Sequence, residues 1–325
     1  MKAAVIHTPG GPDVLKLEIL PIPKPQPGWV LIRVRAFGLN RSELFTRQGH
    51  SPGVQFPRVL GIEAVGEVEE ALGSTVLRKG DRVATAMGGM GRDFDGGYAE
   101  YTCAPIGHVQ VVKSSLPWEV FGALPEMLQT AWGSLFKSLR LQTGERLLVR
   151  GGTTSVGLAA AAIAKNHGAS VTSTSRSKGR EALLKKSGAD QVLIDDGNIA
   201  AQVAAMGPGG GFDKVLEMIG VTTLRDSLRC AKEGGIVCMT GIVGNKWGLD
   251  EGTNPMELIP SGVFLTGYNG GPDDFMTTPL QELVEQVENG TLHVQVGKVF
   301  KLDEIVEAHR VMEENKAGGK IVVLP

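Results

Sequence analysis

Hydrophobic and polar residues alternate in short runs over the first third of the chain, which predicts a β-rich region. The runs occupy residues 2–7, 29–37, 61–69, 82–86 and 98–103. Alternation with a period of two is typical of half-buried strands, and glycines bound several of these runs. Residues 21–28 form a proline-rich connection, which suits an extended loop because proline has no N–H for a β-ladder. We expect this region to form a first domain over residues 1–122.

Helical and strand patterns alternate from residue 116 onward, which predicts a second architecture. Two helices are expected at residues 118–124 and 127–137. The later segments are expected strands at 146–149, 169–174, 191–194, 214–217, 235–240 and 263–267, and expected helices at 156–166, 178–186, 199–205 and 223–231. This alternation predicts a doubly wound α/β domain with a six-stranded parallel sheet over residues 123–268. Residues 269–325 follow with expected helices at 282–288 and 303–313 and a strand at 319–324.

A glycine-rich turn at residues 151–157 separates an apolar run from an Ala-rich helical run. Such a strand–turn–helix directs backbone N–H groups toward a pyrophosphate. The best alignment with G-x-G-x-x-G is Gly152-Thr153-Thr154-Ser155-Val156-Gly157, in which Thr154 replaces the middle glycine. We predict that these six residues bind a dinucleotide and that the three hydroxyls donate to phosphate oxygens. The alternative is an ordinary βα turn without a ligand.

The segment after the next expected strand predicts which dinucleotide binds. A site that selects NAD places Asp or Glu about 20 residues after the first glycine. Residues 172–180 contain no acid there, but several hydroxyls and three cations. We therefore predict NADP(H), with Thr174, Ser175, Arg176 and Arg180 around the 2′-phosphate. The alternative is that both arginines are solvated surface cations.

Composition and charge narrow the class of protein further. A length of 325 residues suggests two domains or one large domain, and 42% hydrophobic residues supply sizeable cores. The net charge of -2 gives no electrostatic reason to expect nucleic acid or membrane partners. No apolar run has transmembrane length, and the N-terminal residues lack the regions of a signal peptide. The three cysteines are odd in number and far apart, which argues against a disulfide framework. We expect a cytoplasmic protein.

Several motifs in a fixed order resemble one enzyme superfamily. They are GLNRSELFTRQG, PRVLGIEAVGEV, GDRVA, GGYAEYTCAP, ALPEMLQTAWGSL, the glycine-rich turn and GKIVVLP. Together they resemble the zinc-independent, quinone oxidoreductase-like branch of the medium-chain dehydrogenase/reductase superfamily, over nearly the whole chain. The resemblance implies a GroES-like β-rich catalytic domain and a Rossmann domain, with the C-terminal segment returning to the first domain. It also implies an active site in the cleft between the domains.

Departures from the zinc-dependent relatives indicate that no metal is bound. Asn40 stands where those relatives have a cysteine ligand, and Ile62 replaces the histidine of a Gly-His-Glu motif. The structural zinc lobe of the family carries four cysteines, whereas residues 87–103 contain only Cys103. Zinc prefers sets of Cys and His ligands, so we predict no metal site. Without this Lewis acid, reduction of activated acceptors is the expected chemistry.

The resemblance also implies a set of site residues. Asn40, Thr130 and Tyr98 are the catalytic candidates, and Asn40 and Thr130 are also expected near the nicotinamide. The remaining cofactor candidates are Gly241, Ile242 and Val243, which follow the last strands of the predicted sheet, and Phe264 and Leu265, which are expected to flank the nicotinamide. Glu43 is expected to line the cleft and Glu63 to make a structural bond, whereas His50 is expected at the surface, with proton donation as the alternative.

Each of these candidates also has a structural interpretation. Asn40 is a good cap for a helix that begins near Ser42. Thr130 is able to bond its own helix backbone. Tyr98 would pack between domains, and an apolar run such as Phe264-Leu265 is often core.

The predicted function is an NADPH-dependent reduction of quinones or α,β-unsaturated carbonyl compounds, which are small electrophilic acceptors. A polar group near Asn40 would stabilise the developing oxyanion. Two alternatives stay open: an enoyl-thioester reductase and a non-catalytic NADPH-binding protein. We also expect a homodimer, because the strand candidates at 235–240 and 263–267 lie near one sheet edge and exposed edges tend to be paired.

Overall fold

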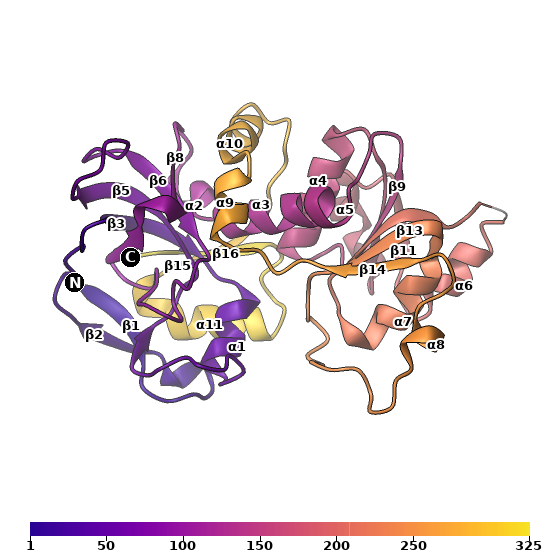
Figure 1. The fold of residues 1–325 in the computed structure, drawn as a ribbon, viewed down its shortest axis with the longest axis horizontal. Coiled ribbons are helices and arrows are strands. Elements are labelled where there is room, and N and C mark those ends of the chain that lie inside the picture. Colours follow the sequence, from indigo (N-terminus) through magenta and orange to yellow (C-terminus); the bar gives the residue numbers. More distant parts are fainter. Residues whose placement is uncertain (208) are drawn as a thin grey trace. The chain divides into compact units, whose positions relative to one another are not determined.

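The chain divides into two compact units in this computed structural model, which describes residues 1–207 and 209–325 (Figure 1). Unit 1 consists of Met1–Gln129, Gly270–Asn289 and Gln295–Pro325, and unit 2 consists of Thr130–Asn269 and Gly290–Val294. The division therefore falls at residue 129/130, within the helix that follows the expected boundary at 122/123. Most of the C-terminal segment belongs to the same unit as the N-terminus.

Unit 1 is built around a seven-stranded sheet with a smaller three-stranded sheet. The larger sheet has the order β15 (Val296–Lys301), β16 (Lys320–Leu324), β3 (Trp29–Gly38), β5 (Glu63–Ala71), β6 (Arg82–Ala86) and β8 (Val109–Val111), with β7 (Tyr101–Pro105) also paired to β3. The smaller sheet has the order β2 (Lys16–Ile19), β1 (Lys2–Ile6) and β4 (Arg58–Val59). The last strand of the chain, β16, thus lies between β15 and β3.

The strands of unit 1 follow the alternation expected from the sequence. Val30, Ile32 and Val68 point inward with Val83 and form one apolar cluster. The helical elements of this unit are η1 (Pro12–Val14), α1 (Arg41–Arg47), η2 (Ile106–His108), α2 (Trp118–Phe121), α9 (Pro272–Thr277), α10 (Leu280–Glu288), η5 (Leu302–Glu304) and α11 (Ile305–Glu313). Helix α3 (Pro125–Trp132) begins in unit 1 and ends in unit 2.

Unit 2 contains the predicted six-stranded parallel sheet. Its order is β11 (Gln191–Ile194), β10 (Ser170–Ser175), β9 (Arg146–Arg150), β12 (Phe212–Glu217), β13 (Ala231–Met239) and β14 (Phe264–Gly267). Every neighbouring pair is parallel. In chain order this is 3-2-1-4-5-6, the Rossmann order, so the carboxyl ends of all six strands meet at one edge. The fold class expected from the sequence is confirmed.

The helices of unit 2 connect these strands. They are η3 (Gly133–Ser138, a π-helix), α4 (Ser155–Asn166), η4 (Lys178–Arg180), α5 (Glu181–Lys186), α6 (Ile199–Ala204), α7 (Val221–Cys230) and α8 (Pro255–Leu258). Residues 156–164 of α4 are buried, which explains why this helix is rich in alanine. Leu148, Val215 and Val237 from the sheet pack with Leu224 and Leu228 of α7.

Several element boundaries differ from those expected. The helix expected at 127–137 begins at Pro125, and its second half is the π-helix η3. The helix expected at 178–186 starts as the short 3-10 helix η4. Strand β13 already begins at Ala231, which was expected to end a helix. Within the described residues, the helices are all too short or too polar to cross a bilayer.

Candidate functional site

The glycine-rich turn of unit 2 has the geometry of a phosphate-binding turn. Gly151 has φ +83°, a left-handed conformation that favours glycine. A Cβ atom on Gly152 would lie 2.9 Å from Cβ of Ser173, and one on Gly157 would lie 2.7 Å from the Gly151 carbonyl oxygen. The turn therefore packs closely on β10 and on itself. Helix α4 starts directly after it, at Ser155, where the first-turn N–H groups lack intrahelical acceptors.

Thr154 has a structural role that differs from the prediction. Its hydroxyl oxygen accepts a hydrogen bond from Gly157 N at 3.0 Å and caps helix α4. The same hydroxyl donates to the Gly151 carbonyl oxygen at 2.9 Å. Its only proton is thus used inside the turn, and a bond from Thr154 to phosphate stays a prediction. Thr153 and Ser155 are partly exposed and keep that role as a prediction.

Of the four residues predicted to bind the 2′-phosphate, two are buried at the end of strand β10 and two are exposed beyond it. Thr174 is buried, and its hydroxyl accepts from Gly151 N at 3.1 Å and lies 3.5 Å from Asp195 Oδ2. Ser175 is also buried, and its hydroxyl donates to the Ser177 carbonyl oxygen at 3.0 Å. Both hydroxyls are therefore bonded within the protein, and their contact with the ligand stays a prediction. Arg176 and Arg180 are exposed beyond the strand.

The loop after strand β13 lies at the same carboxyl edge of the sheet. Gly241 N and Val243 N donate to the carbonyl oxygens of Glu217 and Met218, at 3.2 and 3.3 Å. A Cβ atom on Gly241 would lie 2.2 Å from the Met218 carbonyl oxygen, so only glycine fits this close approach. Gly241, Ile242 and Val243 are half-exposed. Their position at the edge where ligands bind in open α/β sheets is consistent with the predicted cofactor site.

Phe264 and Leu265 lie on strand β14, and their place beside the cofactor stays a prediction. Phe264 is the first residue of β14 and pairs with Ile236, whereas the carboxyl end of the strand is Gly267. Three residues of a strand span about 10 Å, so Phe264 lies well before the ligand-binding edge. The two side chains are 60% and 37% exposed, so the core interpretation is wrong. They form part of the outer edge of the sheet.

A buried arginine that the sequence analysis missed lies directly before the turn. Arg150 is fully buried, and its Nε and Nη2 donate to the two carboxylate oxygens of Asp195, both at 2.8 Å. Its Nη1 donates to Asp226 Oδ2 at 2.7 Å and to Ser227 Oγ at 3.1 Å. Burial raises the pKa of Asp195, but the bonds to Arg150 outweigh burial and hold that pKa below its ordinary value. We call Arg150, Asp195 and Asp226 the Arg150 cluster.

Glu217, at the end of β12, belongs to the same polar layer. It is fully buried and accepts from Ile219 N at 2.6 Å and Gly220 N at 3.0 Å. It also accepts from the hydroxyls of Thr223 and Ser227. Burial raises the pKa of Glu217 despite these bonds. The ends of β9, β11 and β12 are thereby joined by hydrogen bonds beneath the loops at this edge.

Unit 1 contains a second buried polar cluster, around Asn40. Asn40 precedes helix α1, and its backbone N–H donates to Glu43 Oε2 at 3.1 Å, one half of a capping box. Lys320 of β16 lies 2.8 Å from Glu63 Oε1 and 3.4 Å from Glu126 Oε2. Glu63 Oε2 accepts from Glu126 N at 2.9 Å, near the start of α3. The structural bond expected for Glu63 is confirmed, and Lys320 is the partner that was missed.

The side chain of Asn40 is almost fully used by this cluster. Its Nδ2 donates to Glu63 Oε1 at 2.9 Å and to Glu43 Oε1 at 3.2 Å, and its Oδ1 accepts from Lys320 Nζ. Two carboxylates on one side and an ammonium on the other define which atom is nitrogen. Both amide protons are therefore donated to carboxylates. The protein itself thus uses both donors of this side chain, and a catalytic role of Asn40 stays a prediction.

Charge in the Asn40 cluster is unequally compensated. The pKa of Glu43 is raised to about 7, because burial and the neighbouring Glu63 outweigh the bonds from backbone N–H groups and the charge of Lys320. Burial lowers the pKa of Lys320, but Glu63 and Glu126 outweigh burial and hold it above its ordinary value. Gly38 makes room for the pair, because a Cβ atom there would lie 2.4 Å from both Glu63 Oε1 and Lys320 Cε.

Tyr98 packs inside unit 1. It has no exposed surface, stacks on Phe37 with ring centroids 4.8 Å apart, and its hydroxyl lies 3.1 Å from His309 Nε2. Both of these contacts lie within unit 1, and a catalytic role of Tyr98 stays a prediction. His50 is exposed, as expected. Thr130 is half-buried in helix α3, and its role stays a prediction.

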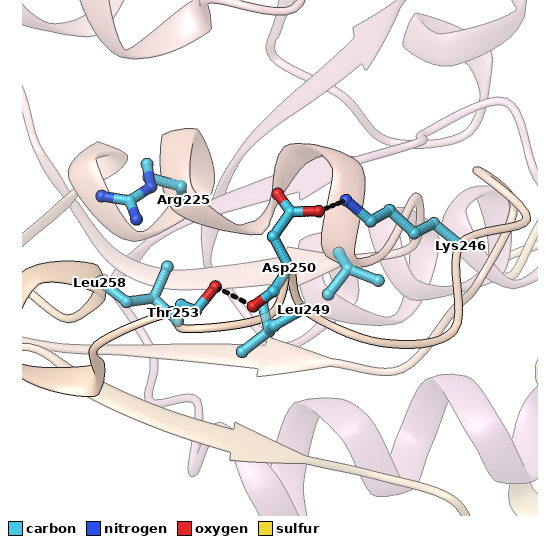
Figure 2. A pocket seen from close by; sticks show the side chains of 7 residues that line it. Arg225, Lys246, Leu249, Asp250, Thr253 and Leu258 are labelled. Carbon is cyan, nitrogen blue, oxygen red and sulfur yellow. Dashed lines mark hydrogen bonds and ion pairs between the residues drawn. The ribbon is translucent and has the colours of Figure 1, made fainter.

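Among the described residues, neither a metal-binding group nor the pocket shown in Figure 2 contributes further residues to the predicted cofactor site. Across residues 1–207 and 209–325, no group of three or more His, Cys, Asp and Glu side chains is arranged to hold a metal ion. The pocket lies in unit 2 between α7 and the loop before α8, and none of the predicted site residues lines it. Lys246 and Asp250 form an ion pair within it at 2.5 Å, and Thr253 Oγ1 donates to the Asp250 carbonyl oxygen at 2.6 Å.

Comparisons with known proteins agree with the fold. Residues 26–114 match the alcohol dehydrogenase GroES-like domain family, and residues 187–323 match the zinc-binding dehydrogenase family. A quinone oxidoreductase from Lama guanicoe is 30% identical over 334 residues, which cover 100% of this chain and 97% of that protein.

Two solved structures cover 100% of this chain and 100% of their own. A mycobacterial protein solved in complex with NADPH is 29% identical with a TM-score of 0.87, and an NAD-dependent alcohol dehydrogenase is 28% identical with a TM-score of 0.89. Their descriptions name different cofactors, so similarity alone does not choose between NADP and NAD.

Proposed function

Because the chain belongs to the medium-chain dehydrogenase/reductase superfamily, in its quinone oxidoreductase-like branch, we propose that it reduces quinones or α,β-unsaturated carbonyl compounds with NADPH and without zinc. The observation that carries the choice of cofactor is the end of β10. Arg176 and Arg180 are exposed there, while strand β10 itself ends without an acid. Two cations suit a 2′-phosphate, and their bonds to it would be charge-assisted.

The residues of unit 2 fit a bound dinucleotide. The close packing of Gly152 and Gly157 leaves the backbone of the turn open to a pyrophosphate, at the positive end of helix α4. Thr153 and Ser155 carry the hydroxyls that would donate to phosphate oxygens. Gly241, Ile242 and Val243 would lie beside the cofactor at the carboxyl edge. When bound, the nicotinamide supplies a hydride, and the protein supplies orientation and electrostatics.

Asn40 and Thr130 keep a role as positioning groups for the carboxamide. Asn40 Oδ1 has a second lone pair beyond the one that Lys320 uses, so it is able to accept one N–H. The hydroxyl of Thr130 is able to donate or accept. Neither residue is a general acid at neutral pH, so we propose that solvent water supplies the proton that completes the reduction.

The proposed assembly is a homodimer that forms through strand β14, in the cytoplasm. Strand β14 is the edge of the parallel sheet, and its side chains Phe264 and Leu265 are exposed. Long apolar edge strands are usually paired or covered in native proteins. A twofold contact between two copies of β14 would cover both residues.

The function is tested by following oxidation of NADPH and of NADH with four classes of acceptor: quinones, enones, enals and enoyl-CoA thioesters of increasing chain length. We expect turnover of quinones or enones with NADPH in preference to NADH. Rates that rise with acyl chain length would favour an enoyl-thioester reductase. Tight binding of NADPH without turnover of any acceptor would favour a non-catalytic binding protein.

A further inference from the structure

Arg150 occupies an unusual position, because a fully buried arginine ends the strand that leads into the predicted phosphate-binding turn. We infer that Arg150 and Asp195 are positioning residues of the dinucleotide site, and that Arg150 favours NADPH over NADH by neutralising Asp195. The identity of the ligand in this inference rests on the proposed function. The evidence for it comes from hydrogen bonds and charges within unit 2.

A chain of contacts connects Asp195 to the glycine-rich turn. Asp195 Oδ2 lies 3.5 Å from Thr174 Oγ1, and this hydroxyl accepts from Gly151 N at 3.1 Å. Gly152 N also donates to the Thr174 carbonyl oxygen at 3.2 Å. The left-handed Gly151 is therefore held in place through Thr174, whose hydroxyl direction depends on Asp195. Arg150 determines the position of Asp195 because it holds both of its carboxylate oxygens.

Asp195 also lies beside the position that distinguishes the two cofactors. Its backbone N–H donates to the Ser175 carbonyl oxygen at 2.9 Å, at the end of β10 and directly before Arg176. A carboxylate near this point accepts from the ribose 2′-hydroxyl of NADH and repels the 2′-phosphate of NADPH. Asp195 is thus the acid that the sequence segment 172–180 lacks, supplied by the neighbouring strand.

The salt bridge between Arg150 and Asp195 removes the preference for NADH that a free Asp195 carboxylate would give. Both oxygens of Asp195 are bound by one guanidinium in a two-bond pair, a geometry that lysine does not reproduce. The remaining Nη1 of Arg150 binds Asp226, which caps helix α6 by accepting from Ile199 N at 3.0 Å. Arg150 is therefore fixed on two sides. Its charge offsets that of Asp195, and the exposed Arg176 is left to attract the 2′-phosphate.

The test compares Arg150→Met, Asp195→Asn, the double variant and the control Arg229→Met, which removes the same charge from the exposed surface of α7. Fluorescence titration gives the Kd of each variant for NADPH and for NADH. We expect Arg150→Met to weaken NADPH roughly tenfold more than NADH, because the negative charge of Asp195 then lacks its counter-ion near the end of β10 and repels the 2′-phosphate. We expect Asp195→Asn to shift the ratio of the two Kd values the opposite way, and the double variant to restore the ratio of the unmodified protein.

Opposite shifts distinguish a charge effect from loss of structure. If the role were purely structural, the ratio of the two Kd values would shift in the same direction in both single variants. That result would overturn the inference, and so would an unchanged ratio in both variants. If Arg150→Met fails to fold, Asp195→Asn alone decides, because its ratio must move in favour of NADPH.

A second measurement needs no cofactor. Hydrogen exchange of the Gly151 amide in the unliganded protein should be faster in Arg150→Met than in Arg229→Met, because the acceptor Thr174 is no longer held. Equal exchange rates would overturn the positioning role. If the unmodified protein binds neither dinucleotide, the proposed function fails, whereas exchange at Gly151 still tests the role of Arg150.

Discussion

Lys320 and Glu63 form a salt bridge of 2.8 Å in which both side chains are almost completely covered, at 1% and 0% exposure. A buried pair of this kind gains stability only when the remaining polar atoms are also bonded. Here Asn40, Glu126 and the start of helix α3 complete the bonding. Removal of either partner would leave an unpaired charge in the interior of unit 1.

Replacement of Lys320 by methionine should therefore lower the free energy of unfolding by about 3–5 kcal/mol, because Glu63 stays buried without its cation. The double variant Lys320→Met/Glu63→Gln should lose less than the sum of the two single variants, since Glu63 no longer carries a charge without its cation. Urea unfolding measures each value. The control is Lys2→Met, which breaks an exposed salt bridge of the same length with Asp303 and should have little effect. A similar loss in both variants would contradict the prediction.

Stability should also depend on the protonation of Glu43. Its pKa is about 7 in the folded protein against an ordinary value of 4.5, so the folded state binds more protons than the unfolded state between these values. The contribution of Glu43 to the free energy of unfolding should therefore fall by about 3 kcal/mol as pH rises from about 4.5 through 7.

Buried His309 acts in the opposite direction. Burial lowers the pKa of His309 to about 3, so this group reduces stability as pH falls below its ordinary value of 6.5. The variant Glu43→Gln removes the effect of the carboxylate and keeps that of His309. The free energy of unfolding of this variant should therefore rise between pH 4.5 and 6.5, whereas that of the unmodified protein should change little because the two effects cancel. Parallel pH profiles of the two proteins, from urea unfolding between pH 4.5 and 8, would contradict the assignment to Glu43.

Replacement of Arg176 by alanine should weaken NADPH and leave NADH nearly unchanged. A charge-assisted bond to the 2′-phosphate contributes about 1.5–3 kcal/mol, so the Kd for NADPH should rise by at least tenfold. Arg180→Ala should act in the same direction. Lys185→Ala, which removes a cation paired with Glu181 on the neighbouring helix, is the control. Equal affinities for NADPH and NADH in the unmodified protein would refute the idea.

The purified protein should contain no stoichiometric zinc, and a chelator should leave its activity unchanged. The side chain of Ile62 has no atom that binds a metal, and Asn40 Oδ1 already accepts from Lys320. The positive charge of Lys320 also opposes a second cation at this place. Elemental analysis decides the question, and about one tightly held zinc ion per chain is the result that would count against us.

The assembly prediction concerns the exposed edge of β14. Phe264→Lys places a charge on this edge and should convert a dimer to a monomer, because charged residues prevent edge pairing. Ile19→Lys makes the same change at an 80% exposed apolar residue of unit 1 and should leave the dimer intact. Light scattering at micromolar concentration gives the mass of each. A monomer for the unmodified chain would end this hypothesis.

Local patterns in the sequence were sufficient to predict the strands and helices that make up unit 2. The period of apolar residues identified all six strands, and the glycines of the turn marked the βα junction before α4. Both signals are local, because they depend on backbone geometry within a few residues. The π-helix η3 was missed, since its residues have an ordinary helical pattern.

The use of individual polar groups was not predictable in the same way. Thr154 and Thr174 carry the hydroxyls expected in a nucleotide site, yet the protein itself uses both of them. Lys320 was visible only as one residue of an apolar strand, and Arg150 only as the end of another. Their partners lie on other strands, and the pairing of strands is not encoded in the residues adjacent to them.

The position of strand β16 in the chain affects the order in which the two units are able to fold during synthesis. It closes the larger sheet between β15 and β3, and it carries Lys320, yet it follows every residue of unit 2 along the chain. Every residue of unit 2 has been synthesised before it, whereas unit 1 still lacks both a central strand and the only lysine that its Asn40 cluster contains among the described residues. Vectorial synthesis therefore allows the nucleotide-binding half to fold on the nascent chain. Unit 1 completes its larger sheet only when residues 320–324 have been made, and a premature stop before them would leave Glu63 without its counter-ion and β15 without its neighbour.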